Sequence, residues 1–284
     1  MPYLEHFRLK QEPFGLTPNR ALYYPENHAQ ILAALLYAIE RGEGIVKVVG
    51  EVGTGKTMLC RLLLQSLTEF AEVAYITAPR TDPLAIVQNV CKEFGIKTVK
   101  GQDLFDLLSR HLIKVREEGR RAILVVDEAQ SLDQRGLETV RLLTNYETDD
   151  SKLLQVVLFG QPELDQLLRQ HSLRQLAQRI TFSLYTQPFD RDAVKRYVQH
   201  RVNLCTLAET PHHLFSKVAL DMIARASRGV PRVVNVLADR ALLAAYAESA
   251  REVQRRHVRI ALQEGDLWPV SPSLWARIVE SILP

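Results

Sequence analysis

Residues 50–57 of this chain read GEVGTGKT, the G-x-x-x-x-G-K-[ST] pattern of a phosphate-binding loop. The motif follows the apolar run 45–49 and precedes a helical pattern from about Lys56 to Leu67. A loop of this kind requires a strand before it and a helix after it. Its glycines let backbone N–H groups turn toward phosphate oxygens, and the following helix adds its positive dipole end. The segment therefore predicts a nucleoside triphosphate site.

The loop residues have separate expected roles. Lys56 can reach the β- and γ-phosphates, and the Thr57 hydroxyl can ligate Mg²⁺. We therefore expect ATP or ADP with Mg²⁺ as the bound group. Nucleotide contacts are expected from Gly50, Glu51, Val52, Gly53, Thr54, Gly55, Lys56, Thr57 and Met58.

Strands and helices alternate after residue 45. Besides 45–49, the predicted strands are 73–76, 122–126, 154–159 and 180–184. Several are nearly continuous apolar runs, as in a parallel sheet covered on both faces, so we predict an α/β fold with five parallel strands flanked by helices. Lys47 interrupts the first strand. Its ammonium must extend to solvent or meet an acid, and both alternatives stay open.

The composition changes after Pro188, where only helical patterns follow, at about 190–207, 215–226, 231–247 and 256–263. We expect an all-α lid domain over residues 188–270. Residues 1–187 are expected to hold an aromatic- and proline-rich N-terminal segment and the nucleotide-binding αβα domain.

Residues 271–284 form a predicted amphipathic tail. One broad apolar face carries Leu274, Trp275, Ile278, Val279 and Ile282. This face indicates either a helix packed on its own chain or a helix that docks on a partner.

Composition narrows the cellular setting. The net charge of +3 over 284 residues is too small to indicate nucleic-acid binding by itself. Three widely spaced cysteines are typical of free thiols in a reducing compartment. The first residues lack the apolar core of a signal peptide, and no apolar run is long enough to span a membrane. We expect a cytoplasmic protein, either free or held at a membrane by partners.

Two acids follow the third predicted strand, which ends at Asp127 and Glu128. An acid at the C-terminal end of a parallel strand faces the ligand crevice. Asp127 is expected to hold Mg²⁺, together with Thr57. Glu128 is expected to orient the attacking water as a general base.

A polar residue also follows the fourth predicted strand. Gln161 is expected to lie beside the γ-phosphate and to sense it. Asn145 and Glu147 are weaker candidates for this role, because they follow a helix and can simply cap it.

Two arginines complete the expected catalytic set of Lys56, Asp127, Glu128, Gln161, Arg179 and Arg232. Arg179 precedes the fifth predicted strand, where it can reach a neighbouring subunit as an arginine finger. Arg174 is the second choice for that role. Arg232 follows Pro231, which suits a first helical turn, and can face the γ-phosphate from the lid.

These motifs in this order resemble those of AAA+ ATPases. More closely, the chain resembles the general secretion pathway protein A family of ATPases. The matching segments are 3–9 (YLEHFRL), 13–19 (PFGLTPN), 42–44 (GEG), 50–57, 127–130 (DEAQ) and 160–164 (GQPEL). The resemblance implies Walker A at 50–57, Walker B at Asp127 and Glu128, sensor 1 at Gln161, a finger at Arg179 and sensor 2 at Arg232.

Secretion-type members of that family continue into a transmembrane helix and a periplasmic peptidoglycan-binding domain. We expect neither here, as in the short cytosolic ATPase of mannose-sensitive haemagglutinin (MSHA) type IV pilus biogenesis. The resemblance therefore implies ATP hydrolysis coupled to assembly of a type IV pilus or a related secretion apparatus. The implied partners are other copies of the chain in a ring-like homo-oligomer, and membrane-bound apparatus components.

Two other classes of function stay open. The family also resembles DNA-dependent transposition ATPases of the target-selection type, so nucleic acid is an alternative partner, although not the favoured one. A nucleotide-gated scaffold with little turnover is the second alternative.

Overall fold

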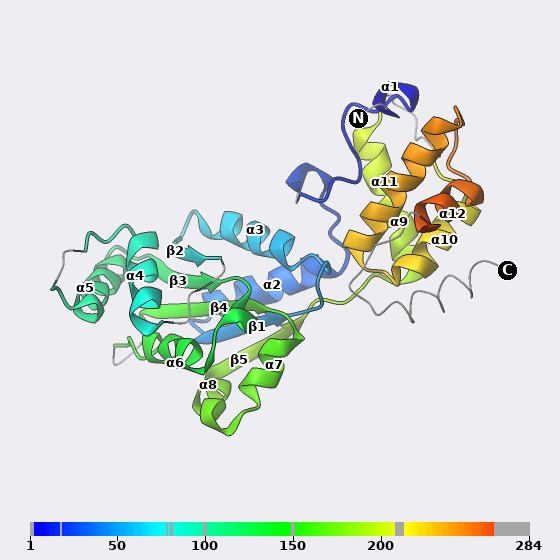
Figure 1. Ribbon diagram of the computed structural model, residues 1–284. Helices are drawn as coiled ribbons and strands as arrows, with labels where there is room; N and C mark the ends of the chain where they lie inside the picture. Colours follow the sequence, from blue (N-terminus) through cyan, green and yellow to red (C-terminus); the bar gives the residue numbers. More distant parts are fainter. Residues whose placement is uncertain are drawn as a thin grey trace. The chain divides into compact units, whose positions relative to one another are not determined.

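A computed structural model describes residues 3–17, 19–77, 79, 82–98, 101–148, 151–207 and 213–263 (Figure 1). The predicted tail 271–284 lies outside the described residues. By their contacts, the residues form two compact units. Of the described residues, those within Asn27–Val52 and Lys56–Gln187 form an α/β unit, and those within Met1–Glu26, Gly53–Gly55 and Pro188–Pro284 form a helical unit.

The α/β unit contains the predicted five-stranded sheet. All its strand pairings are parallel, and the strand order is β2-β3-β4-β1-β5. The strands begin and end within two residues of their predicted bounds: β1 Ile45–Val49, β2 Ala71–Ile76, β3 Arg121–Val126, β4 Leu154–Gly160 and β5 Ile180–Tyr185. Every residue of the central strand β4 is buried, which explains its continuous apolar run.

Helices cover both faces of this sheet (Figure 1). Val46 and Val48 of β1 share a core with the helices α2 (Glu26–Glu40) and α3 (Lys56–Leu67). Ile45 and Val49 point to the opposite face, because side chains alternate along a strand. There they share a core with α4 (Pro83–Glu93), α5 (Leu104–Glu117), α6 (Gln134–Leu143), α7 (Pro162–Leu168) and α8 (Arg174–Arg179).

Lys47, which interrupts the first predicted strand, meets an acid. Its ammonium forms an ion pair with Asp165 of α7 on the face that Ile45 and Val49 also occupy. The partner lies 118 residues along the chain.

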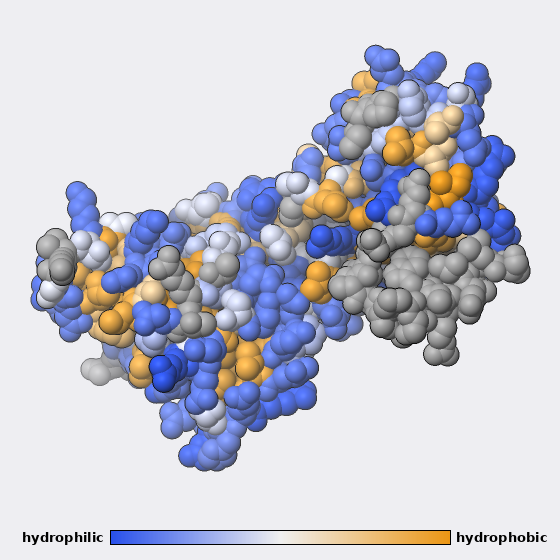
Figure 2. Space-filling view, in the orientation of Figure 1, coloured by the Kyte–Doolittle hydropathy of each residue, from blue (hydrophilic) through white to orange (hydrophobic). Residues whose placement is uncertain are grey.

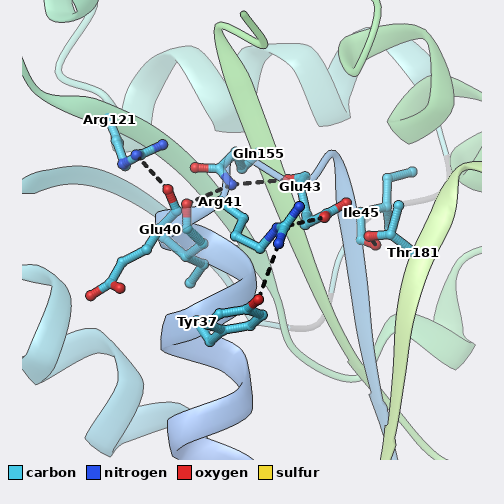
Figure 3. Close-up of polar contacts among 9 residues, drawn as sticks. Tyr37, Glu40, Arg41, Glu43, Ile45, Arg121, Gln155 and Thr181 are labelled. Carbon is cyan, nitrogen blue, oxygen red and sulfur yellow. Dashed lines mark hydrogen bonds and ion pairs between the residues drawn. The ribbon is translucent and has the colours of Figure 1, made fainter.

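The end of α2 is held by side chains from neighbouring strands (Figure 3). Gln155 of β4 donates from Nε2 to the carbonyl oxygens of Ile39, at 3.1 Å, and Glu43, at 2.9 Å. Arg121 of β3 donates to the carbonyl oxygen of Glu40 at 2.8 Å. The last carbonyls of a helix have no partner within the helix, so the bonds to Ile39 and Glu40 supply partners there, and the bond to Glu43 holds the turn that follows.

Replacing Gln155 with leucine is expected to lower the free energy of unfolding by about 1–3 kcal/mol, because the carbonyl groups of Ile39 and Glu43 lose the Gln155 amide as a donor. Gln155 is only 4% exposed, so water cannot readily replace its amide. Denaturant titration of the purified variant measures this loss. Gln178→Leu, at an exposed position of α8, is the matched control. Equal stability of the two variants would contradict a role for Gln155 in stabilising the end of α2.

The helical unit contains α9 (Arg191–Cys205), α10 (Lys217–Ser227), α11 (Pro231–Ala247) and α12 (Arg255–Gln263). Its core also takes in side chains from the N-terminal segment, which includes the short helix α1 (Tyr3–His6): Tyr3, Phe7, Leu9, Phe14 and Leu22. By its contacts, this segment groups with the helical unit and not with the α/β unit. Its aromatic side chains complete the helical core instead. None of the described helices has the length and apolarity needed to cross a membrane.

Candidate nucleotide site

The phosphate-binding loop joins β1 to α3, as the motif predicts. Gly53 and Gly55 have φ angles of +81° and +94°, a backbone conformation that side chains disfavour. The Gly50 N–H donates to the carbonyl oxygen of Gly160 at 3.2 Å, which ties the start of the loop to the end of β4. The glycines are therefore required by the path of the backbone.

Lys56 is buried at the start of α3, with 6% of the residue exposed. Its Nζ donates to the carbonyl oxygens of Gly50, at 2.7 Å, and Glu51, at 2.9 Å. Burial lowers the pKa of Lys56, while the carboxylates of Glu128 and Asp127 act in the opposite direction and raise it. The structure therefore holds the ammonium inside the loop, close to two acids.

Asp127 follows β3 directly and is 5% exposed. One carboxylate oxygen accepts from the Glu128 N–H at 2.9 Å, and the other accepts from the Tyr75 hydroxyl at 3.3 Å. Burial is the main cause that raises the pKa of Asp127. The carboxylate of Asp127 and the hydroxyl of Thr57, in the first turn of α3, are oxygen donors of the kind that Mg²⁺ prefers. The residues present therefore fit a magnesium ion.

Glu128 lies in a cluster of amide groups. Its Oε2 accepts from the side-chain amide of Gln161 at 2.9 Å and from the side-chain amide of Gln130. The Oε1 of Gln130 in turn accepts from the Gln161 N–H at 3.0 Å. The backbone of Glu128 is left-handed, with φ 52° and ψ 39°, which is uncommon outside glycine and often occurs at functional sites. Glu128 and Gln161 are thus brought together, with Gln130 bridging them.

Two residues that contact the acids are not among the residues predicted from the sequence: Gln130 contacts Glu128, and Tyr75 contacts Asp127. Gln130 lies two residues after Glu128 in the DEAQ segment, and Tyr75 lies on β2 next to β3. Polar side chains at neighbouring strand ends were the available signal. The alternative sensors lie elsewhere: the Asn145 N–H donates to the Leu142 carbonyl at 3.0 Å, and Glu147 pairs with Lys152.

Arg179 lies where the strands begin, whereas the loop follows the end of β1. It ends α8, immediately before Ile180 pairs with Ile45 at the start of the parallel strands β5 and β1. The half-buried side chain donates to Thr144 Oγ1 at 2.9 Å. Arg174 is exposed and contacts His171 at 3.2 Å. Arg179 is therefore not beside the loop of its own chain.

Arg232 is the second residue of α11 and is exposed. Its backbone N–H donates to the carbonyl oxygen of Gly53 at 3.3 Å, and Gly53–Gly55 group with the helical unit by their contacts. A Cβ atom on Gly53 would lie 2.7 Å from the Cβ of Arg232. The absence of a side chain at Gly53 thus permits this close approach.

Comparisons with known proteins agree with this fold. A model of the AAA domain family matches residues 39–168. General secretion pathway protein A of Aeromonas hydrophila is 42% identical over 266 residues, which cover 92% of this chain and 48% of that protein. The chain therefore spans about half the length of this curated relative.

Solved structures show the same fold at lower identity. Cdc6p of Pyrobaculum aerophilum aligns with a TM-score of 0.69 and 20% identity, over 91% of this chain and 72% of that chain. The ORC2 protein of Aeropyrum pernix aligns with a TM-score of 0.64 and 20% identity, over 87% and 72%. The RuvB branch migration motor of Thermotoga maritima aligns with a TM-score of 0.55 and 18% identity, over 89% and 73%.

The parallel sheet, the loop between β1 and α3, and the family match define a AAA+ protein of the P-loop NTPase class. Within that class, the chain is a relative of general secretion pathway protein A.

Proposed function

We propose that this chain hydrolyses ATP to ADP and phosphate, and that its nucleotide state drives assembly of a type IV pilus (MSHA-like) or a related secretion apparatus. One observation carries the hydrolytic part. Glu128, a carboxylate in an uncommon backbone conformation, lies directly after the metal-ligand candidate Asp127 and is bonded to Gln161. The residues proposed as base, metal ligand and polar sensor thus lie at adjacent strand ends.

Each residue has a proposed role in the reaction. The loop 50–57 and Met58 bind the nucleotide, and Lys56 neutralises charge on its phosphates. Thr57 and Asp127 would hold Mg²⁺, which neutralises charge developing on the phosphate oxygens. Glu128 orients the attacking water and accepts its proton, and Gln161 senses the γ-phosphate. Arg232 is assigned to the γ-phosphate from the helical lid, and Arg179 to the site of a neighbouring subunit.

The cellular part of the proposal rests on the relative's name, which places that protein in a secretion pathway. We propose a cytoplasmic location, with membrane association through apparatus components. Self-association is supported by apolar patches on the mostly hydrophilic surface of the α/β unit (Figure 2). Its exposed large apolar side chains include Tyr37, Leu84, Phe105, Ile113, Leu142 and Tyr185.

Phosphate release by the purified chain with Mg²⁺ and ATP tests hydrolysis directly. We expect steady turnover that does not require nucleic acid. Stimulation by duplex DNA that falls steeply with salt would instead support the transposition-type ATPase. Tight ATP binding without turnover would support a nucleotide-gated scaffold.

Lys56→Ala is expected to weaken ATP binding at least about tenfold. A hydrogen bond to a charged group contributes about 1.5–3 kcal/mol, and about 1.4 kcal/mol corresponds to a factor of ten. Titration calorimetry with ATP measures the change, and Lys92→Ala, at an exposed position of α4, is the control. Unchanged affinity in the Lys56 variant would place the nucleotide elsewhere.

A further inference from the structure

The ion pair between Lys47 and Asp165 is shielded from water. The Lys47 side chain is 12% exposed and the Asp165 side chain 18%. Lys47 occupies the middle of β1, between residues that are buried in the core on the same face. The aromatic ring of Tyr185, at the end of β5, lies with its centroid 5.7 Å from the Lys47 ammonium. Two charges are thus held among apolar side chains.

Stability alone does not explain such a pair. Replacing a buried ion pair with apolar residues of similar volume is often neutral or stabilising, because desolvation of the charges offsets their attraction. An ion pair also constrains position, because the two charged groups attract strongly only when they lie close together. The Lys47–Asp165 pair therefore links α7 to β1 at a defined position.

The helix that Asp165 anchors begins directly after Gln161, the proposed sensor. Gln161 is the N-cap of α7, and Asp165 follows it by four residues, about one helical turn. Because Gln161 is joined directly to the first turn of α7, a shift of α7 along β1 also acts on Gln161. The strand that Lys47 anchors leads into the phosphate-binding loop. The pair thus connects the strand before the loop to the helix that Gln161 caps.

Apolar contacts hold α7 less specifically. The helix has only seven residues, and it buries Leu164 and Leu168. Apolar contact is non-directional, so it favours burial of this face without fixing one position along the strand. The contact between the Gln161 amide and Glu128 requires a defined position, because it spans 2.9 Å.

We propose that Lys47 and Asp165 are positioning residues that hold α7 where the Gln161 amide contacts Glu128. The consequence for rate rests on the hydrolytic function proposed above, whereas the placement of Gln161 does not. A misplacement of about 1 Å can cost roughly 100-fold in rate. Loss of the pair is therefore expected to lower kcat while ATP affinity is kept.

The double variant Lys47→Met/Asp165→Leu removes both charges at similar volume. We expect an unchanged or higher melting temperature, unchanged ATP affinity by calorimetry, and a kcat at least about tenfold lower. The control is Glu72→Leu/His111→Leu, which removes a pair of comparable exposure, 23% and 22%, between β2 and α5, together with the contact of Glu72 to Arg120. If the double variant fails to fold, Asp165→Asn keeps the shape and removes one charge.

The second measurement is the NMR signal of the Gln161 side-chain amide in nucleotide-free protein, assigned by its loss in Gln161→Ala. We expect the chemical shift of this amide to change in the double variant and in Asp165→Asn, and to be unchanged in the control. If the wild type has no turnover, the hydrolytic function fails, and this signal alone decides the positioning role. An amide signal that stays in place in the folded double variant overturns the proposal, whatever the rate.

Discussion

Glu128→Gln is expected to leave ATP bound and to lower turnover by at least about 100-fold, the lower end of what a general base contributes. The glutamine side chain has the same size but cannot accept the proton of the attacking water. Its oxygen can still accept from the Gln161 and Gln130 amides, so the cluster around position 128 keeps its hydrogen bonds. Steady-state phosphate release gives the rate, and calorimetry gives the ATP affinity.

The control for this variant is Glu163→Gln. Glu163 is an exposed acid of α7 whose charge also acts on Lys56, so its replacement makes the same change in local charge. We expect near-normal turnover in this control. Normal turnover in Glu128→Gln would remove Glu128 from the role of base. An equal loss in both variants would show that local negative charge, not proton acceptance, sets the rate.

The sheet and the loop could be predicted from the sequence because their signals are local. The apolar run 45–49, the motif 50–57 and the following helical pattern are contiguous, so each supports the others. Parallel strands buried on both faces also appear as apolar runs, which made the five strands recognisable.

The partners of the polar side chains could not be predicted in the same way. Lys47 and Asp165 are 118 residues apart, and Gln130 and Gln161 meet only because β3 and β4 are neighbours in the sheet. The aromatic residues of the N-terminal segment indicated that it packs on something, but no local pattern says which core it completes. Strand order and long-range packing supply what the sequence leaves open.

Arg179→Ala is expected to bind ATP normally and to hydrolyse it at least about tenfold slower. An arginine finger can raise the hydrolysis rate by roughly 10³–10⁵-fold, so a tenfold loss is small compared with its full effect. Arg179 lies at the edge of the sheet where the strands begin, and the loop follows the opposite end of β1. It is therefore poorly placed for its own phosphates, and the expected loss depends on a neighbouring subunit.

Thr144→Val separates this role from local structure. Thr144 Oγ1 accepts the 2.9 Å hydrogen bond from Arg179, so the valine variant loses that bond and keeps the arginine. Turnover close to normal in Thr144→Val, with a large loss in Arg179→Ala, is the expected pattern. Equal losses would mean that Arg179 serves the packing of α8 against the end of α6.

If the site is shared between subunits, a mixture of two inactive variants is expected to recover activity. Specific activity of the wild type is expected to rise with protein concentration as subunits associate. Mixing Arg179→Ala with Lys56→Ala is expected to restore part of the activity, because the first keeps an intact loop and the second supplies the arginine. Activity that is independent of concentration, an inactive mixture and a monomer in sedimentation would together show that each chain completes its own site. Arg179 is then a structural residue bonded to Thr144.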